Sequence, residues 1–118
     1  MRISRKVGPW NPSLLNRPWI AKVIKWPVGQ RAELEWGTFL GEASTGGELE
    51  IEAKPGDVVR YGQKSKKHDS DPTARWAIVT SLGRLALIQT ELEAAKTFRQ
   101  NRQLTAPAID TTLQGEAR

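Results

Sequence analysis

Basic and aromatic side chains are interleaved along the first 31 residues of this 118-residue chain. Seven Lys or Arg residues and three of the five tryptophans occur in that stretch, and no acidic residue occurs there. Lys and Arg bind phosphate groups, and flat aromatic rings stack on unpaired bases. This combination of residue types predicts a surface that binds nucleic acid.

A second basic element follows in the polar loop that contains Lys64, Lys66 and Lys67. We expect the basic side chains of both elements to contact phosphates of DNA or RNA, and Trp10 or Trp19 to stack on a base. Stacking of this kind favours single strands. The residues expected at the nucleic-acid surface are Arg2, Arg5, Lys6, Trp10, Arg17, Trp19, Lys22, Lys25, Lys64, Lys66 and Lys67.

Acidic residues dominate the next part of the chain, where residues 33–57 hold seven acids and a single lysine. Glu48, Glu50 and Glu52 alternate with apolar residues, which places the three carboxylates on one face of a strand. That face is either solvated, or a mimic of nucleic-acid charge, or a docking surface for a basic partner. The last alternative defines a second hypothesis, a protein-binding adaptor or inhibitor of the kind that phages and mobile elements encode, with aromatic side chains as anchors.

The sequence offers little for catalysis, because it has one histidine and no cysteine. Thiolate nucleophiles, disulfides and cysteine-based metal sites are therefore excluded. A serine activated by His68 would lie in a polar loop, where preorganisation is poor. The same loop contains Asp69 and Asp71, but nearby lysines disfavour a bound cation. We expect no enzyme, no cofactor and no metal site.

Length and composition predict a single domain with net charge +5 and a sequence pI near 9.9, which favours acidic partners. The sequence has no apolar run long enough for a membrane span or a signal peptide, so neither is expected. The absence of cysteine agrees with a cytoplasmic location, which we expect.

Hydrophobic alternation and turn composition predict six strands and one helix. The strands are expected at residues 19–26, 31–40, 48–53, 58–63, 75–80 and 84–88, and the helix at residues 90–103. Thr90 and Glu93 have the spacing of a capping box at the start of this helix. Three prolines indicate an extended basic arm at residues 1–18, outside a domain at 19–103, and residues 104–118 have the composition of a disordered tail.

These elements predict a mainly β fold of the α+β class. It would be a small curved antiparallel sheet, or an SH3-like or OB-like barrel, of five or six strands with one C-terminal helix. The order of elements resembles those barrels, and the turn-to-strand sequence Pro-Gly-Asp-Val-Val at 55–59 is the local match. No site residue follows from this resemblance.

The tryptophans are expected to divide between core and surface. Trp36 and Trp76 lie in apolar, alternating strands and are predicted to be core residues. Trp10, in the arm, is either a latch onto the domain or a contact to a partner. Trp19 and Trp26 are seven residues apart and face opposite sides of a regular strand, so one lies outside the core unless the strand is bulged or covered on both sides.

Overall fold

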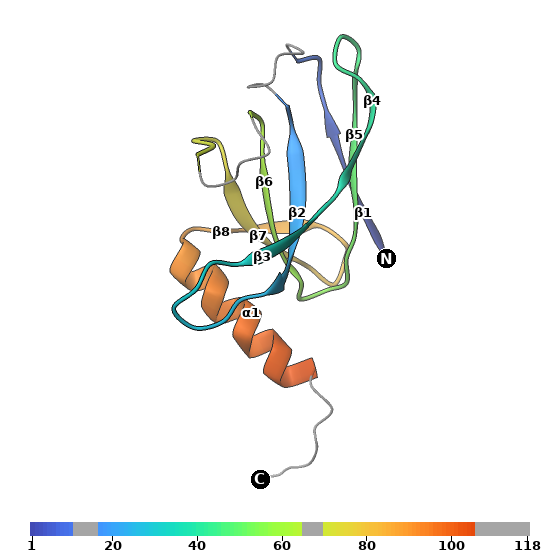
Figure 1. Cartoon of the computed structure of the whole chain (residues 1–118). Coiled ribbons are helices and arrows are strands. Elements are labelled where there is room, and N and C mark those ends of the chain that lie inside the picture. Colours follow the sequence, from blue (N-terminus) through green and yellow to red (C-terminus); the bar gives the residue numbers. More distant parts are fainter. Residues whose placement is uncertain (11–16, 65–69, 106–118) are drawn as a thin grey trace.

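The computed structural model describes residues 1–10, 17–64 and 70–105, which form eight strands and one helix (Figure 1). This confirms a mainly β fold with a C-terminal helix. The elements are β1 (Arg2–Val7), β2 (Trp19–Lys25), β3 (Glu33–Trp36), β4 (Thr38–Glu42), β5 (Gly46–Glu52), β6 (Val58–Gly62), β7 (Arg75–Val79), β8 (Leu85–Ile88) and α1 (Glu91–Thr105).

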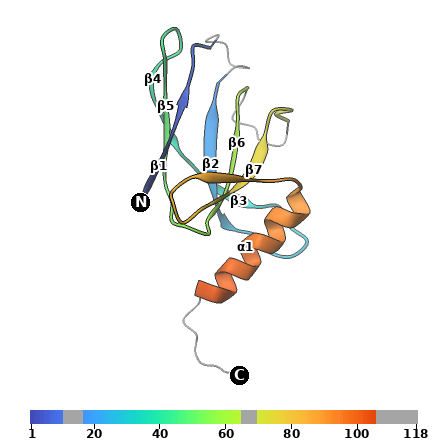
Figure 2. The same cartoon turned by 180° about the vertical axis from the view of Figure 1, so that it is seen from behind.

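The strands form two antiparallel sheets, one with the order β1-β5-β4 and one with the order β3-β2-β6-β7-β8. Ile20, Leu49 and Val59 belong to the apolar cluster that joins the two sheets. A second apolar cluster, which includes Val58 and Phe98, joins the opposite face of the five-stranded sheet to α1 (Figure 2). The five-stranded sheet is therefore covered on both faces, although α1 crosses only part of its face.

Strand β2 supplies side chains to both of these clusters, as its alternation requires. Ile20 faces the three-stranded sheet and Val23 faces α1. The pairing of β2 with β3 shifts register between Val23 and Lys25, and this bulge turns Trp26 to the same side as Val23. Trp19 and Trp26 are therefore both buried. This is the outcome expected for a strand that is bulged and covered on both sides.

The strand predicted at residues 31–40 is divided at Gly37, with β3 in one sheet and β4 in the other. The amide of Gly37 donates to the carbonyl of Ile20 at 2.8 Å, and a Cβ at this position would collide with the main chain of Glu50. The chain passes from one sheet to the other at this corner, so the residues before and after Gly37 no longer alternate between the two faces of a single sheet. Trp36 is 44% exposed, so its prediction as a core residue is wrong, whereas Trp76 is buried as predicted.

Residues 2–7 are a strand of the domain and not part of a separate arm, which corrects the predicted boundary at residue 18. Strand β1 pairs with β5 over six residues, from Arg2 opposite Glu52 to Val7 opposite Gly47. Ile3 and Val7 lie in the core between the sheets. Two buried anchors and a full ladder of main-chain hydrogen bonds hold this basic segment to the domain.

The helix begins where the capping box predicts. The Glu93 amide donates to Thr90 Oγ1 at 3.1 Å, and the Thr90 hydroxyl donates to the Glu93 carboxylate at 3.3 Å, so the carboxylate contacts the hydroxyl rather than the Thr90 amide. The helix continues two residues beyond the predicted end at 103, to Thr105. The remainder of the predicted tail, 106–118, lies outside the described residues.

Candidate nucleic-acid interface

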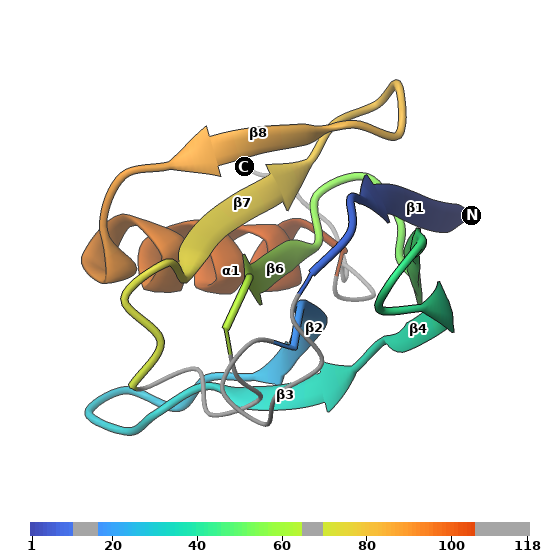
Figure 3. The ribbon, with the colours of Figure 1, turned by 90° about the horizontal axis from the view of Figure 1, so that it is seen from above.

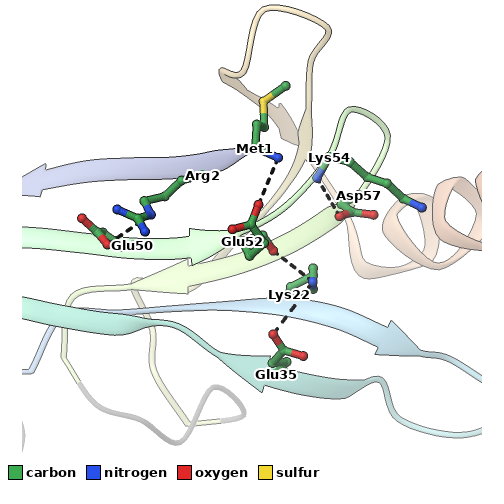
Figure 4. Close-up of polar contacts among 8 residues, drawn as sticks. All are labelled: Met1, Arg2, Lys22, Glu35, Glu50, Glu52, Lys54 and Asp57. Atoms are coloured by element: carbon green, nitrogen blue, oxygen red, sulfur yellow. Dashed lines mark hydrogen bonds and ion pairs between the residues drawn. The ribbon is translucent and has the colours of Figure 1, made fainter.

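The basic residues of β1 and the acidic residues of β5 face each other within the chain. The register places Arg2 opposite Glu52 and Lys6 opposite Glu48. Arg2 Nε lies 3.5 Å from a carboxylate oxygen of Glu50, and the N-terminal ammonium lies 3.0 Å from the Glu52 carboxylate (Figure 4). A hydrogen bond from that ammonium, together with its charge, lowers the pKa of Glu52. Much of the charge separation seen in the sequence is therefore balanced internally.

Arg5 and Lys22 of the predicted set also make contacts inside the domain. The Arg5 guanidinium lies over the ring of Tyr61, 4.5 Å from its centroid, and its buried Nη1 has no hydrogen-bond partner among the described residues. Lys22 Nζ donates to the main-chain oxygen of Glu52 at 2.9 Å and lies 3.9 Å from the Glu35 carboxylate (Figure 4). Both side chains thus bridge the two sheets, whereas Lys25 is exposed at the end of β2.

Trp19 does not present a ring to solvent, which corrects its prediction as a base-stacking residue. It is only 3% exposed, and its indole Nε1 donates to Asp71 Oδ2 at 2.7 Å. The loop before β7 brings the carboxylate to this position, 52 residues along the chain. Because Trp19 and Asp71 are so far apart in the chain, the residues around Trp19 in the sequence give no indication of this partner.

Asp71 is the centre of a buried hydrogen-bond network. One oxygen accepts from Trp19 Nε1 and from the Lys64 amide at 3.1 Å, and the other accepts from the Thr73 amide at 2.8 Å and the Thr73 hydroxyl at 2.6 Å. Burial alone would raise the pKa of Asp71, but the hydrogen bonds from Thr73, Trp19 and Lys64 outweigh it and hold the pKa at about 2. Gly62 fits here because a Cβ would collide with Asp71 and Trp19.

Arg17 and Lys64 are the two residues of the predicted set that the network brings together at the surface. The Arg17 amide donates to the Lys64 carbonyl at 3.0 Å, and both side chains are exposed. Because the Lys64 amide also binds Asp71, this basic pair is tied to the Trp19 indole. Lys66 and Lys67 follow directly in the sequence but lie outside the described residues, as do His68 and Asp69.

Trp36 is an exposed aromatic residue next to Trp19, and it is not in the set predicted from the sequence. Its ring packs against Trp19 at 5.3 Å between centroids. The sheet register aligns Trp36, Ala21, Arg60 and Trp76 in one row across four strands, on the face that α1 covers only in part. We call these four residues, with Trp19, the tryptophan row.

Arg60 is the basic member of the tryptophan row. Its guanidinium lies 4.3 Å from the ring centroid of Trp76, which stacks in turn on Trp26 at 4.9 Å. In the sequence, Arg60 stands out because its neighbours Val58, Val59 and Tyr61 are apolar or aromatic. Cation–π contact and the planar guanidinium make such an arginine compatible with a stacked aromatic surface.

Trp10 has the contacts of a latch, one of the two alternatives that the sequence left open. Its ring packs edge-on against Phe39, with 5.5 Å between centroids, and its amide donates to the Ala43 carbonyl at 2.9 Å. The side chain is half-buried. It lies with β4, in a different sheet from the tryptophan row.

Among residues 1–10, 17–64 and 70–105, no three His, Cys, Asp or Glu side chains are grouped closely enough to bind a metal ion. The helix in this part of the chain is neither long enough nor apolar enough to cross a membrane. Comparisons with protein families, with curated proteins and with solved structures find nothing that matches this chain.

Proposed function

We propose that this chain is a non-enzymatic nucleic-acid-binding module with a preference for single strands, and that Trp36, the exposed end of the tryptophan row, is its base-stacking residue. One observation carries the proposal: Trp36 is an indole that is 44% exposed although its ring packs against Trp19, and Trp19 is linked through Asp71 to the exposed basic pair Arg17 and Lys64. The contacts from Trp36 to Trp19, from Trp19 to Asp71 and from Asp71 to the Lys64 amide connect the exposed indole to the basic pair through a buried network. A base would stack on Trp36 while the basic pair binds the flanking phosphates.

The electrostatics of this surface support the same proposal. Glu33 and Glu35 alternate with Leu34 and Trp36, so their carboxylates point to the other face of β3. Asp71 is buried, and its carboxylate accepts hydrogen bonds from Trp19, Lys64 and Thr73. The net charge of +5 then favours the approach of a polyanion to the face that carries Arg60 and not the Glu33 and Glu35 carboxylates.

The alternative of an adaptor that docks through Glu48, Glu50 and Glu52 receives less support. Cross-strand basic residues lie opposite two of these carboxylates, and Glu50 and Glu52 are both in ion pairs. A basic partner would have to displace these contacts or add to a face that is already balanced. We therefore do not develop this second function.

Binding to a labelled single-stranded oligothymidylate tests the proposal, with a duplex of equal length for comparison. Trp36→Ala should weaken single-strand binding by about 5- to 150-fold, which corresponds to about 1–3 kcal/mol for one stacked base. Trp36→Phe should keep most of the affinity. Leu40→Ala is the matched control, because Leu40 is 47% exposed in the other sheet, and it should bind as the wild type does.

The salt dependence of binding tests the basic pair separately. Replacing Arg17 and Lys64 together by Gln should reduce the slope of log affinity against log salt by about 0.7 for each lost phosphate contact. Urea unfolding of each variant establishes that the domain remains folded. If the wild type fails to bind at low salt, or if Trp36→Ala binds as tightly as Leu40→Ala, the proposal is wrong.

A further inference from the structure

Strand β8 is a sheet edge without charged side chains. The two sheets have four edge strands, and β1, β3 and β4 each contain Arg, Lys or Glu. Strand β8 has the sequence Leu-Ala-Leu-Ile and forms the outer margin of its sheet beside β7 (Figure 3). Charges on edge strands prevent pairing with other chains, and an uncharged edge leaves its main-chain groups available for it.

Exposed apolar side chains also occur on β8 and on the segments that flank it. Leu87 of β8 is 52% exposed, Leu82 is exposed in the turn before the strand, and Leu92 is exposed in the first turn of α1 after it. Met1 is also exposed, and its sulfur would lie 3.2 Å from a Cβ at Gly83 in that turn. These four are half of the eight large hydrophobic side chains that are exposed in the described residues. Such a concentration is typical of an interaction surface.

The hydrogen bonds of the β7–β8 hairpin identify the main-chain groups that point outward. The Thr80 amide donates to the Arg84 carbonyl at 2.8 Å, so Arg84 faces β7. The amide and carbonyl of Val79 are bonded on the β6 side, at Asp57 and Gly56, which gives the same alternation. In an antiparallel ladder the next residues alternate, so the N–H and C=O groups of Leu85 and Leu87 point away from the sheet.

We propose that β8 is a homodimerisation strand, which pairs antiparallel with β8 of a second copy of this chain. The two-fold axis passes through Leu87, which pairs with Leu87 of the second copy, and Leu85 lies opposite Gln89 of that copy. In this register the outward N–H and C=O groups of one β8 lie opposite those of the other. Side chains that are opposite each other also point to the same face of the joined sheet. The two five-stranded sheets become one continuous sheet of ten strands.

The charges at the two ends of β8 favour a second copy as the partner and antiparallel as the direction. Arg84 precedes the strand, and Glu91 and Glu93 follow it. Antiparallel pairing brings Arg84 next to Glu91 of the second copy, on both sides of the axis. Parallel pairing would instead place like charges together. Opposite charges around an apolar centre specify register and partner in this way.

Sedimentation velocity over a wide range of protein concentration tests the dimer. The wild type should shift from monomer to dimer as concentration rises, and Leu87→Lys should remain monomeric because two ammonium groups would meet at the axis. Leu40→Lys is the matched control, since Leu40 has a similar exposure on the β4 edge, and it should dimerise as the wild type does. Because both side chains are exposed, both variants should fold, and urea unfolding checks this.

A second measurement does not depend on weakening the interface. The chain has no cysteine, so Leu87→Cys introduces a single thiol, and the Cα atoms of a hydrogen-bonded antiparallel pair are about 5.5 Å apart, within disulfide range. Mild oxidation should give a disulfide dimer of Leu87→Cys and not of Leu40→Cys. A wild type that stays monomeric throughout, or cross-linking that is equal at both positions, would overturn the proposal.

Discussion

Replacing Asp71 by Asn should destabilise the domain by an amount that depends on pH in a specific way. The carboxylate accepts hydrogen bonds from the Trp19 indole, from the Lys64 amide, and from the amide and the hydroxyl of Thr73. An amide in the same place has one oxygen, and its NH₂ group must face two of these donors. The variant therefore loses both the charge and part of the network.

The magnitude follows from the pKa of Asp71, which is about 2 in the folded protein against an ordinary 3.8. Each tenfold change in proton affinity corresponds to about 1.4 kcal/mol, so the ionised carboxylate contributes about 2 kcal/mol. Because folding lowers this pKa, the contribution is complete above the unfolded value near pH 4. It is lost as the pH falls towards 2.

Urea unfolding, followed by tryptophan fluorescence, measures the difference in unfolding free energy between the wild type and Asp71→Asn. The difference should be about 2 kcal/mol or more at neutral pH and should shrink by roughly 1.5 kcal/mol between about pH 6 and about pH 2.5. Other titrating groups are common to both proteins and cancel. A difference that stays constant over this range, or grows on acidification, would refute the assigned role of the buried carboxylate.

Three further changes test other parts of the fold. Thr90→Ala removes the acceptor of the Glu93 amide and should cost about 1 kcal/mol of unfolding free energy, measured in urea; an unchanged midpoint would contradict the cap. Gly37→Ala places a Cβ against the Ile20 side chain and the Glu50 main chain and should cost about 1–3 kcal/mol of unfolding free energy. Gly8→Ala is the control and should be nearly neutral, because the space around Gly8 is open. Equal thermal midpoints for the two variants would disprove the close approach at Gly37. Deleting residues 1–7 removes β1 and should abolish cooperative unfolding by circular dichroism, and a sharp transition in the shortened chain would show that β1 is dispensable.

Alternation of apolar and polar residues, together with turn residues, was enough to predict most of the strands. Five of the six predicted strands agree with β2, β5, β6, β7 and β8 to within about two residues, because alternation and turn residues define each of them. The capping box located α1 in the same way. A mainly β fold with a terminal helix could be predicted for that reason.

Features that depend on distant partners could not be read in this way. Strand β1 has Arg5 where alternation would place an apolar residue between Ile3 and Val7, and it becomes recognisable only when it is paired with β5. The corner at Gly37 reflects contact with Ile20 and Glu50, and the alternation continues through it in the sequence.

The candidate interface was the part that the sequence predicted least well. Trp19 and Trp36 exchange their expected positions, because a carboxylate from a remote loop holds one indole in the interior.

The pairing of β1 with β5 also constrains the order in which the domain can assemble. Translation completes β1 before β2, β3 and β4, which separate it from its partner in the chain. Until β5 is made, Ile3 and Val7 have no surface on which to be buried, and closing a loop of this length carries an entropic cost. Non-local antiparallel pairing of this kind slows folding relative to local hairpins such as β7–β8. We therefore expect the hairpins to form early, and the three-stranded sheet to form late and after translation of β5.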